Sequence, residues 1–384
     1  MMLGLLLARA AVDVIVLEKH ADFLRDFRGD TIHPSTLELM HELGLLDELL
    51  RLPHQKLPGF SAQIGDTTVP VADLSGLPTR CKFIALMPQW DFLDFLARHA
   101  GASPHFRLRM NAEATTLIEE DGRVVGVRAT TPDGALDVRA DLVVGADGRS
   151  SIVRERARLP VRDLGAPMDV FWFRLSRHPD DPQGTMGRID GGRIFVLINR
   201  GDYWQCGLVI VKGSADARRQ RGIEAFRAEI AAHTPFLRDR VQELASWDDV
   251  KLLTVKVDRL LRWSRPGLLC IGDAAHAMSP IGGVGINLAI QDAVAAANIL
   301  AAPLRESRLE LVHLQRVQRR RRLPTWIVQQ VQVTLQRRVI GAVLGRSGKL
   351  SPPLALRVIA RVPALRRLIG RILGLGVRPE HVRA

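Results

Sequence analysis

The sequence predicts an α/β fold: a Rossmann-like domain with a parallel sheet, an inserted antiparallel-sheet domain and a helical C-terminus. Three observations lead to this expectation. Three apolar segments each lead to an acidic residue close to a predicted helix, as the strands of a parallel sheet do. Short strand-like segments bounded by Gly, Asp and Pro lie between the second and third of them. Arginine-rich segments of helical composition follow residue 300.

The first apolar segment runs from Val12 to Leu17, follows residues 2–10 of helical composition, and ends at Glu18. A helix followed by such a strand is the second half of a nucleotide-binding βαβ unit, in which the acidic residue hydrogen-bonds a ribose. The GxGxxG loop of that unit lies about 20 positions earlier, which is before residue 1. We therefore expect the first strand to be missing and the true start to lie upstream of Met1, a damaged relative being the alternative.

The second segment is DLVVGADGRSSIVR, residues 141–154. A strand over Leu142–Val144 leads into a Gly-rich turn that contains Asp147, and Ser150 or Ser151 can cap a helix towards Arg154. This order is typical of a phosphate-binding helix N-terminus, although an ordinary strand-to-helix turn shows the same pattern.

The third segment is GLLCIGDAAHAMSPIGGVGINLAIQDAVAAANIL, residues 267–300. A buried strand ends at Asp273, and a loop with Pro280 and three glycines precedes a helix that begins near Asn287. The Asp273 carboxylate can accept a hydrogen bond from a sugar-like hydroxyl at the carboxyl end of the sheet. The first amides of the helix are free to bind an electron-rich ring edge.

Together these segments resemble the p-hydroxybenzoate-hydroxylase-like, FAD-dependent aromatic hydroxylases, a family of flavoprotein monooxygenases. Residues 141–154 are similar to the DG motif of that family and residues 272–293 to its GD motif, while residues 28–49 and 87–100 match further family segments. The resemblance covers residues 1 to about 300 and departs from the family in the missing GxGxxG strand and loop. It implies cofactor contacts from Glu18, Arg28, Gln89, Asp147, Arg154, Asp273, Gly283, Gly285, Ile286 and Asn287.

The resemblance also implies a reaction. NAD(P)H, a transient electron donor, reduces FAD, and O2 then forms a C4a-hydroperoxyflavin that hydroxylates an aromatic or other electron-rich small molecule. His33, His276 and Pro280 are candidates for a catalytic role, and the sequence shows no metal-ligand spacing. Two alternatives stay open: an FAD-dependent reductase of a lipid-like prenyl substrate, and a remnant of the family that has lost its cofactor.

Between the two motifs, residues 171–176, 193–200 and 203–212 are predicted antiparallel strands. By resemblance we assign residues 1–52, 83–160 and 255–300 to the FAD-binding domain, 53–82 and 161–254 to the substrate domain, and 301–384 to a C-terminal helical region. Candidate pocket residues are Trp172, Tyr203, Trp204 and Gln205, for which a place in the core is the other interpretation.

The net charge of +13 comes mainly from arginines, many of them after residue 300. From Leu354 to Leu373 apolar residues form a helical stripe among arginines, which Pro363 should kink or divide. Such a helix can lie on an anionic membrane, cover the core of its own chain, or contact a dimer partner. Three widely spaced cysteines indicate a reducing compartment, and no run of 18 apolar residues occurs, so we expect a cytoplasmic protein without a nucleic-acid partner.

Overall fold

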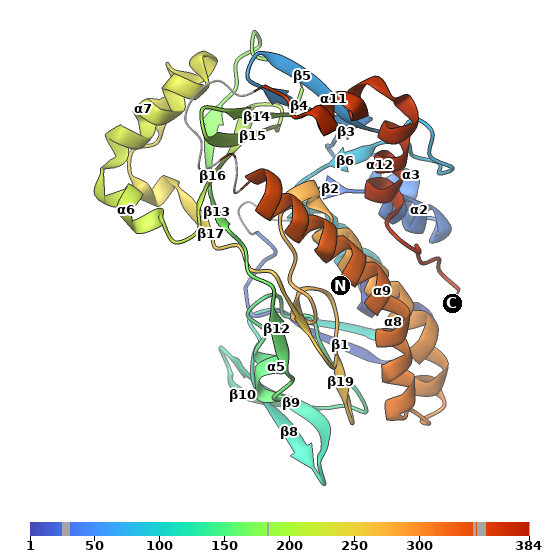
Figure 1. Cartoon of the computed structure of the whole chain (residues 1–384). Helices are drawn as coiled ribbons and strands as arrows, with labels where there is room; N and C mark the ends of the chain where they lie inside the picture. Colours follow the sequence, from blue (N-terminus) through green and yellow to red (C-terminus); the bar gives the residue numbers. More distant parts are fainter. Residues whose placement is uncertain (25–30, 183, 341–342, 344–350, 384) are drawn as a thin grey trace.

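The computed structural model describes residues 1–24, 31–182, 184–340, 343 and 351–383. The long helices α8 (Gly285–Arg305) and α9 (Leu311–Leu335) lie side by side through its body (Figure 1). The molecule is a mixed α/β structure, because parallel strand pairs adjoin these helices and a larger, mainly antiparallel sheet lies beyond them.

Two parallel strand pairs form the layer that the sequence predicts. Strand β1 (Val14–Leu17) pairs with β7 (Phe106–Arg109), and β11 (Val143–Gly145) pairs with β20 (Leu268–Cys270). Among the described residues these pairs belong to separate sheets, and no backbone ladder joins β1 to β11. All three predicted strands are present. The bounds of β1 and β11 are shifted by one or two residues, and β20 ends three residues before Asp273, as strand ends are the least predictable part of an element.

Helix α1 (Met2–Arg9) packs against α8 and α4 (Gln89–Gly101) and lies close to the first parallel pair. A Cβ at Gly4 would lie 2.8 Å from the Phe106 ring, so glycine allows this close approach. Residues Ile281–Arg305 are apolar and long enough to cross a membrane by composition, but 67% of that apolar window is buried inside the protein. We therefore interpret α8 as a core helix.

The larger sheet has seven strands and combines two separated parts of the chain. Its order is β17-β13-β16-β15-β14-β4-β5, antiparallel except for the β14–β4 pair. The strands are β4 (Gly59–Ile64), β5 (Thr67–Asp73), β13 (Met168–Ser176), β14 (Met186–Asp190), β15 (Arg193–Asn199), β16 (Tyr203–Val211) and β17 (Lys251–Leu253). Helices α6 (Ala215–Gln220) and α7 (Ile223–His233) cover one face, as Figure 1 shows. The three predicted antiparallel strands are therefore confirmed.

The remaining elements form smaller sheets of two or three strands and the connections between the layers. They are β2 (Thr31–Ile32), β3 (Gln55–Leu57), β6 (Ile84–Leu86), β8 (Glu113–Glu120), β9 (Arg123–Thr131), β10 (Gly134–Arg139), β12 (Val161–Asp163), β18 (Asp258–Leu260), β19 (Ser264–Arg265), α2 (Pro34–Glu42), α3 (Leu46–Leu49) and α5 (Ile152–Arg156). Single turns of 3-10 helix lie at 235–237, 241–243, 247–249, 272–274 and 281–283.

The C-terminus is helical, as predicted. A turn of π-helix (Gln336–Ile340) follows α9, and α11 (Leu354–Arg361) and α12 (Pro363–Leu375) come next, so Pro363 divides the predicted stripe into two helices. Both helices pack against β5. The three cysteines are free and buried, which agrees with their interpretation as small apolar side chains.

Candidate functional site

Asp147 closes the turn between β11 and α5. Its Oδ1 accepts a hydrogen bond from Ser151 Oγ at 2.5 Å, and its Oδ2 accepts one from the Val153 amide at 3.1 Å. Ser151 Oγ also accepts the Arg154 amide at 3.0 Å, so Ser151 is the helix cap. The Gly-rich turn thus holds the first turn of α5, while Asp147 stays exposed to solvent.

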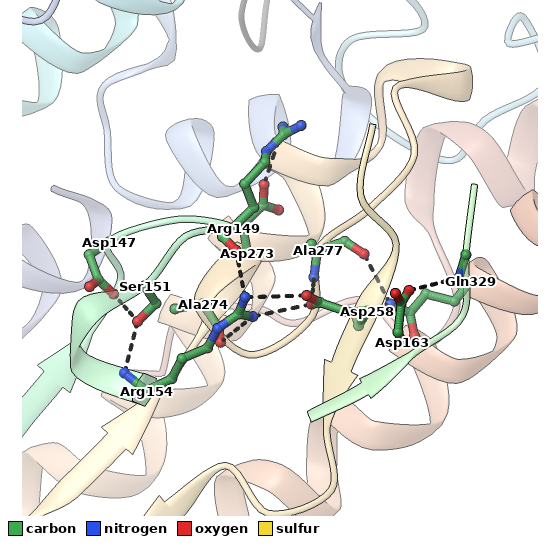
Figure 2. A network of polar contacts seen from close by, with 11 residues as sticks. Asp147, Arg149, Ser151, Arg154, Asp163, Asp258, Asp273, Ala274, Ala277 and Gln329 are labelled. Atoms are coloured by element: carbon green, nitrogen blue, oxygen red, sulfur yellow. Dashed lines mark hydrogen bonds and ion pairs between the residues drawn. The ribbon is translucent and has the colours of Figure 1, made fainter. Parts of the chain in front are cut away.

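Arg154 is buried, with 6% of its surface exposed, and its guanidinium bonds within the protein. It donates to both carboxylate oxygens of Asp258 at 3.2 Å, to the Arg149 carbonyl at 2.5 Å and to the Ala274 carbonyl at 3.5 Å (Figure 2). A cofactor contact of Arg154 therefore stays a prediction, and in this structure its guanidinium is engaged by protein acceptors. Its burial and its full set of acceptors make it the group that joins the two motif loops.

Asp258, on β18, is a functional residue that the sequence reasoning missed. Its side chain accepts the Ala277 amide at 3.4 Å, and its carbonyl accepts Gln329 Nε2 at 2.8 Å. Gln329 Nε2 also lies 3.2 Å from the Ala277 carbonyl, so helix α9 braces the same loop (Figure 2). The single carboxylate among the apolar and basic residues 255–261 is the signal that could have indicated a buried partner.

Asp273 lies at the carboxyl end of β20, next to the loop that contains Asp147. The pairing of Gly145 with Cys270 brings the two motif loops to the same edge of the sheet. Arg149 Nη2 lies 3.7 Å from Asp273 Oδ2, and 30% of the Asp273 side chain is exposed (Figure 2). The structure thus brings Asp147 and Asp273 together, and the Asp273 carboxylate is accessible to a ligand.

The glycine loop after Asp273 is held against strand β2. Gly283 has a φ of +61°, and a Cβ there would lie 2.3 Å from Thr31 Oγ1. Thr31 Oγ1 donates to the Gly283 carbonyl at 2.8 Å. Helix α8 begins at Gly285, and the first amide bonded within it is that of Leu288 to the Val284 carbonyl. The amides of residues 285–287 therefore precede the helical ladder.

Asn287 joins this loop to the segment before α2. Its Oδ1 accepts the His33 amide at 2.9 Å and Thr36 Oγ1 at 2.8 Å, while its Nδ2 donates to the Thr31 carbonyl at 3.0 Å. The same Nδ2 also donates to the Gly283 carbonyl at 3.3 Å. The Asn287 side chain is thus a brace, and only its amide remains for the predicted contact with a ring edge.

His33 is fully buried and caps α2 with extended backbone. Its Nδ1 lies 2.7 Å from the Leu373 carbonyl of α12. Burial lowers the pKa of His33 to about 4, so the ring is neutral at physiological pH. These contacts favour a structural role for this candidate catalytic residue.

His276 belongs to a second buried network. Its Nε2 lies 2.5 Å from Asp292 Oδ2, and Asp292 Oδ1 accepts Arg321 Nε at 2.9 Å. Arg321 also reaches Glu380 at 3.2 Å. Burial alone would raise the pKa of Asp292, but the His276 and Arg321 side chains outweigh it and lower that pKa. His276 therefore helps to lock α8 to α9, and the third catalytic candidate, Pro280, begins the 3-10 turn at residues 281–283.

Three predicted cofactor contacts lie towards the N-terminus. Glu18 stands at the end of β1 and accepts the His20 amide at 3.0 Å, while Gln89 is the first residue of α4 and is partly exposed. Arg28 lies outside the described residues. Glu18 follows β1, and Asp273 follows β20, the partner of β11. Strands β1 and β20 are in different sheets, so Glu18 and Asp273 belong to separate strand pairs.

The four candidate pocket residues divide between the two faces of the seven-stranded sheet. Trp204 is fully buried on the face under α7, and its Nε1 donates to Asp181 at 2.8 Å. Trp172 lies on the other face, over Gly207, whose added Cβ would lie 2.9 Å from the Trp172 ring. Since side chains alternate along a strand, Tyr203 and Gln205 share that face and Trp204 does not. The assignment of Trp204 to a common pocket is therefore wrong.

Comparison with known proteins decides the family. The model of a family described as the FAD binding domain matches residues 1–331. The chain belongs to this FAD-binding family. It is 35% identical to 6-methylpretetramide 4-monooxygenase of Streptomyces rimosus over 372 residues, which cover 96% of this chain and 88% of the relative. It is 27% identical to 3-demethoxyubiquinol 3-hydroxylase of Escherichia coli, covering 85% of this chain and 83% of that protein.

The fold comparison agrees. The structure of p-nitrophenol 4-monooxygenase from Pseudomonas putida matches with a TM-score of 0.75 at 20% identity, covering 97% of this chain and 91% of that one. For some other relatives the chain spans only about 60% of their length. Membership in the FAD-binding family confirms the predicted resemblance, the fold class and the cofactor FAD, and it makes the chain an enzyme of the flavoprotein monooxygenase type. An NAD(P)H donor and a small-molecule substrate with O2 are typical of such enzymes.

The residues present fit the FAD of this family. The accessible Asp273 carboxylate, the amides that open α8 and the left-handed Gly282–Gly283 turn lie in one loop beside β2. A carboxylate suits a ribityl hydroxyl, and helix-terminal amides suit an electron-rich ring edge. Among the described residues, no group of three or more His, Cys, Asp or Glu side chains is placed to hold a metal ion.

Proposed function

We propose that the chain hydroxylates an aromatic or other electron-rich small molecule, with NAD(P)H as electron donor, in the cytoplasm. The single observation that carries this proposal is the similarity to 6-methylpretetramide 4-monooxygenase over nearly the whole chain. That relative is named for the substrate 6-methylpretetramide, and we propose a related substrate for this chain. We also propose that residues 53–82 and 161–254 form the substrate domain, because the seven-stranded sheet contains strands from both segments.

Bound FAD supplies the electron transfer and the activation of oxygen in this proposal. Asp273 accepts a hydrogen bond from the ribityl chain, and the amides of residues 285–287 favour negative charge on the ring edge. The side chains of Asn287 and Arg154 hold these groups in position through bonds to neighbouring backbone. Glu18 and Gln89 serve the adenosine and central parts of the cofactor, as the resemblance implies.

The substrate face is the side of the large sheet that carries Trp172, Tyr203 and Gln205. The same apolar cluster contains Trp172 and Ile281, the residue that opens the glycine loop of the GD motif, so this face adjoins the loop. Packed apolar side chains at that junction exclude water, which would protect reactive intermediates from hydrolysis.

A groove beside α5 is our proposed place for the phosphates of the donor. It has a volume of about 450 Å³ and is bordered by the exposed cations Arg158 and Lys256, by Ser150 and by one carboxylate, that of Glu155. Cations and a hydroxyl are suitable groups for binding phosphate. Replacing both cations by alanine should raise the KM for NAD(P)H severalfold with little change in FAD content; unchanged KM values would refute this placement.

The test of the proposed function is turnover with labelled oxygen. The purified protein, loaded with FAD, should oxidise NAD(P)H faster when an aromatic substrate is added, and one atom of ¹⁸O2 should appear in the product. Substrate reduction without incorporation of oxygen would favour the reductase alternative instead. The Asp273→Ala variant should bind FAD at least about tenfold more weakly, whereas the Asp137→Ala control, on an exposed hairpin, should bind it normally.

A further inference from the structure

Helix α12 is attached to the body of the protein by one face. A Cβ at Gly370 would lie 2.0 Å from the Asp73 carbonyl of β5, and one at Gly374 would lie 2.7 Å from Leu77. The Leu373 carbonyl binds His33, as described above. Glycines at these two positions let the helix approach the strand closely, so its inner face is fixed.

The opposite side of α11 and α12 exposes large apolar side chains. The exposed fractions are 77% for Leu354, 44% for Val358, 37% for Val362, 52% for Leu368 and 43% for Ile372. Leu354 and Val358 are four residues apart on α11, and Leu368 and Ile372 are four residues apart on α12, so each pair lies on one side of its helix. Val362 lies between the two helices, with extended backbone. The packing of these helices on β5 therefore leaves an apolar surface uncovered, which we call the outer stripe.

Arginines run beside the outer stripe. Arg357 and Arg361 precede Val358 and Val362 by one residue, and Arg367 and Arg371 precede Leu368 and Ile372 in the same way. All four are exposed. Residues 351–379 contain no Asp or Glu, so the two helices themselves carry charge of one sign, although Asp73 of β5 lies 3.8 Å from Arg367. Long basic side chains next to apolar ones are the composition of a helix that lies in a membrane interface.

We propose that α11 and α12 dock, through the outer stripe, on a membrane surface that contains anionic lipid. Charge complementarity supports this partner, because guanidinium groups bind lipid phosphates and the apolar residues enter the acyl boundary. A second copy of the chain is a poorer occupant. A twofold interface would place the same patch on itself, with arginines facing arginines and no carboxylate within residues 351–379 to pair with them.

Docking there would place the site close to the lipid. A Cβ at Gly282 would lie 3.3 Å from the Leu373 side chain, so the inner face of α12 touches the glycine loop of the GD motif. A helix with its side chains is about 10–12 Å across, and this thickness alone would separate the loop from the bilayer. Provided that the proposed hydroxylase function is right, the membrane is then the source of an apolar substrate.

Vesicle sedimentation tests the docking without any turnover. The whole FAD-loaded protein should pellet with vesicles of about three parts phosphatidylcholine to one part phosphatidylglycerol, and much less with phosphatidylcholine alone. Raising the salt from about 0.1 M to about 0.5 M should weaken the binding. The Val358→Ser/Leu368→Ser variant should bind at least about tenfold more weakly. The Arg361→Gln/Arg371→Gln variant should lose the preference for anionic vesicles.

The Leu261→Ser variant is the matched control, because Leu261 is 56% exposed and lies outside α11 and α12. It should bind vesicles like the unmodified protein. Equal binding by the control and the Val358→Ser/Leu368→Ser variant would overturn the proposal, as would failure of the unmodified protein to bind anionic vesicles. A dimer in light scattering that dissociates in that double variant, without vesicle binding, would assign the outer stripe to a second copy. Hydroxylation of a water-soluble phenol is measured separately, so either proposal can fail alone.

Discussion

Among single residues, Arg154 and Asp258 matter most for the shape of the site. The pair is bidentate and almost fully buried, and it connects the loop after β11 with the loop after β20. Removing one partner of such a pair leaves an uncompensated charge in the interior, which costs more than the pair contributes. Loss of either side chain should therefore lower the stability of the fold, and weaker cofactor binding should follow from the displaced loops.

The Asp258→Asn variant should lower the free energy of unfolding by about 3–5 kcal/mol, measured by urea denaturation. The Arg128–Asp137 pair is the control, since it is also bidentate, at 2.6 and 2.7 Å, but has side chains 54% and 46% exposed. Asp137→Asn should cost much less than Asp258→Asn, because solvent screens this exposed pair. Equal costs for the two variants would show that Arg154 is solvated and does not hold the loops together.

The buried His33 predicts a pH dependence. Its pKa is about 4 in the folded protein and 6.5 in the unfolded chain, so between these values only the unfolded chain takes up the proton. Stability should therefore fall as the pH decreases from 6.5 to about 4, by about 3 kcal/mol from this residue. The difference in unfolding free energy between the unmodified protein and His33→Asn, measured across that range, should show this slope. A difference independent of pH would contradict the burial of the neutral ring.

At the scale of elements, the glycine loop is the segment in which both the backbone conformation and the packing require glycine. Gly283 has a positive φ and also lies against Thr31, so two separate effects oppose any side chain there. Gly122 at the tip of the β8–β9 hairpin has a φ of +76° with no atom within 4 Å of an added Cβ. Comparison of the two positions separates strain from steric contact.

Gly122→Ala should cost about 1–2 kcal/mol, the usual effect of left-handed backbone, and should leave FAD affinity unchanged. Gly283→Ala should cost more and should weaken FAD binding, because the new methyl group pushes β2 away from the loop that begins α8. Urea denaturation and quenching of flavin fluorescence measure the two quantities. Identical behaviour of both variants would mean that Thr31 moves away freely.

How far the sequence could predict these elements depends on the range of the interactions. Strand β11, the Ser151 cap and the division at Pro363 are local, and each appears within one or two residues of its predicted place. The partner of Arg154 is 104 residues away, and no local pattern could identify it. Trp204 was misplaced because β16 is buried on both faces, so alternation of polar and apolar residues is absent there.

On the scale of the whole molecule, the C-terminal tail closes the structure over α8. Arg320 and Arg321 both reach Glu380, at 2.7 and 3.2 Å, and the Glu380 amide donates to Gln291 at 2.5 Å. The sequence showed only an arginine-rich surface in this region. Part of the basic charge of this region is therefore internal, whereas the arginines beside the outer stripe of α11 and α12 face outward.

The two parallel pairs, β1–β7 and β11–β20, share no backbone ladder among the described residues, and the predicted FAD contacts lie on both. A ligand that contacts both pairs connects them. Because FAD binds only the folded protein, it should stabilise that state by about 4 kcal/mol when its free concentration is about 1,000 times its Kd. Removal of FAD should lower the Tm accordingly and should increase hydrogen exchange at β1 and at the start of α8 together. The Glu18→Gln variant should match the unmodified protein without FAD and gain less from it. If FAD protected α8 alone, the contact predicted for Glu18 would be refuted and the two pairs would be independent units.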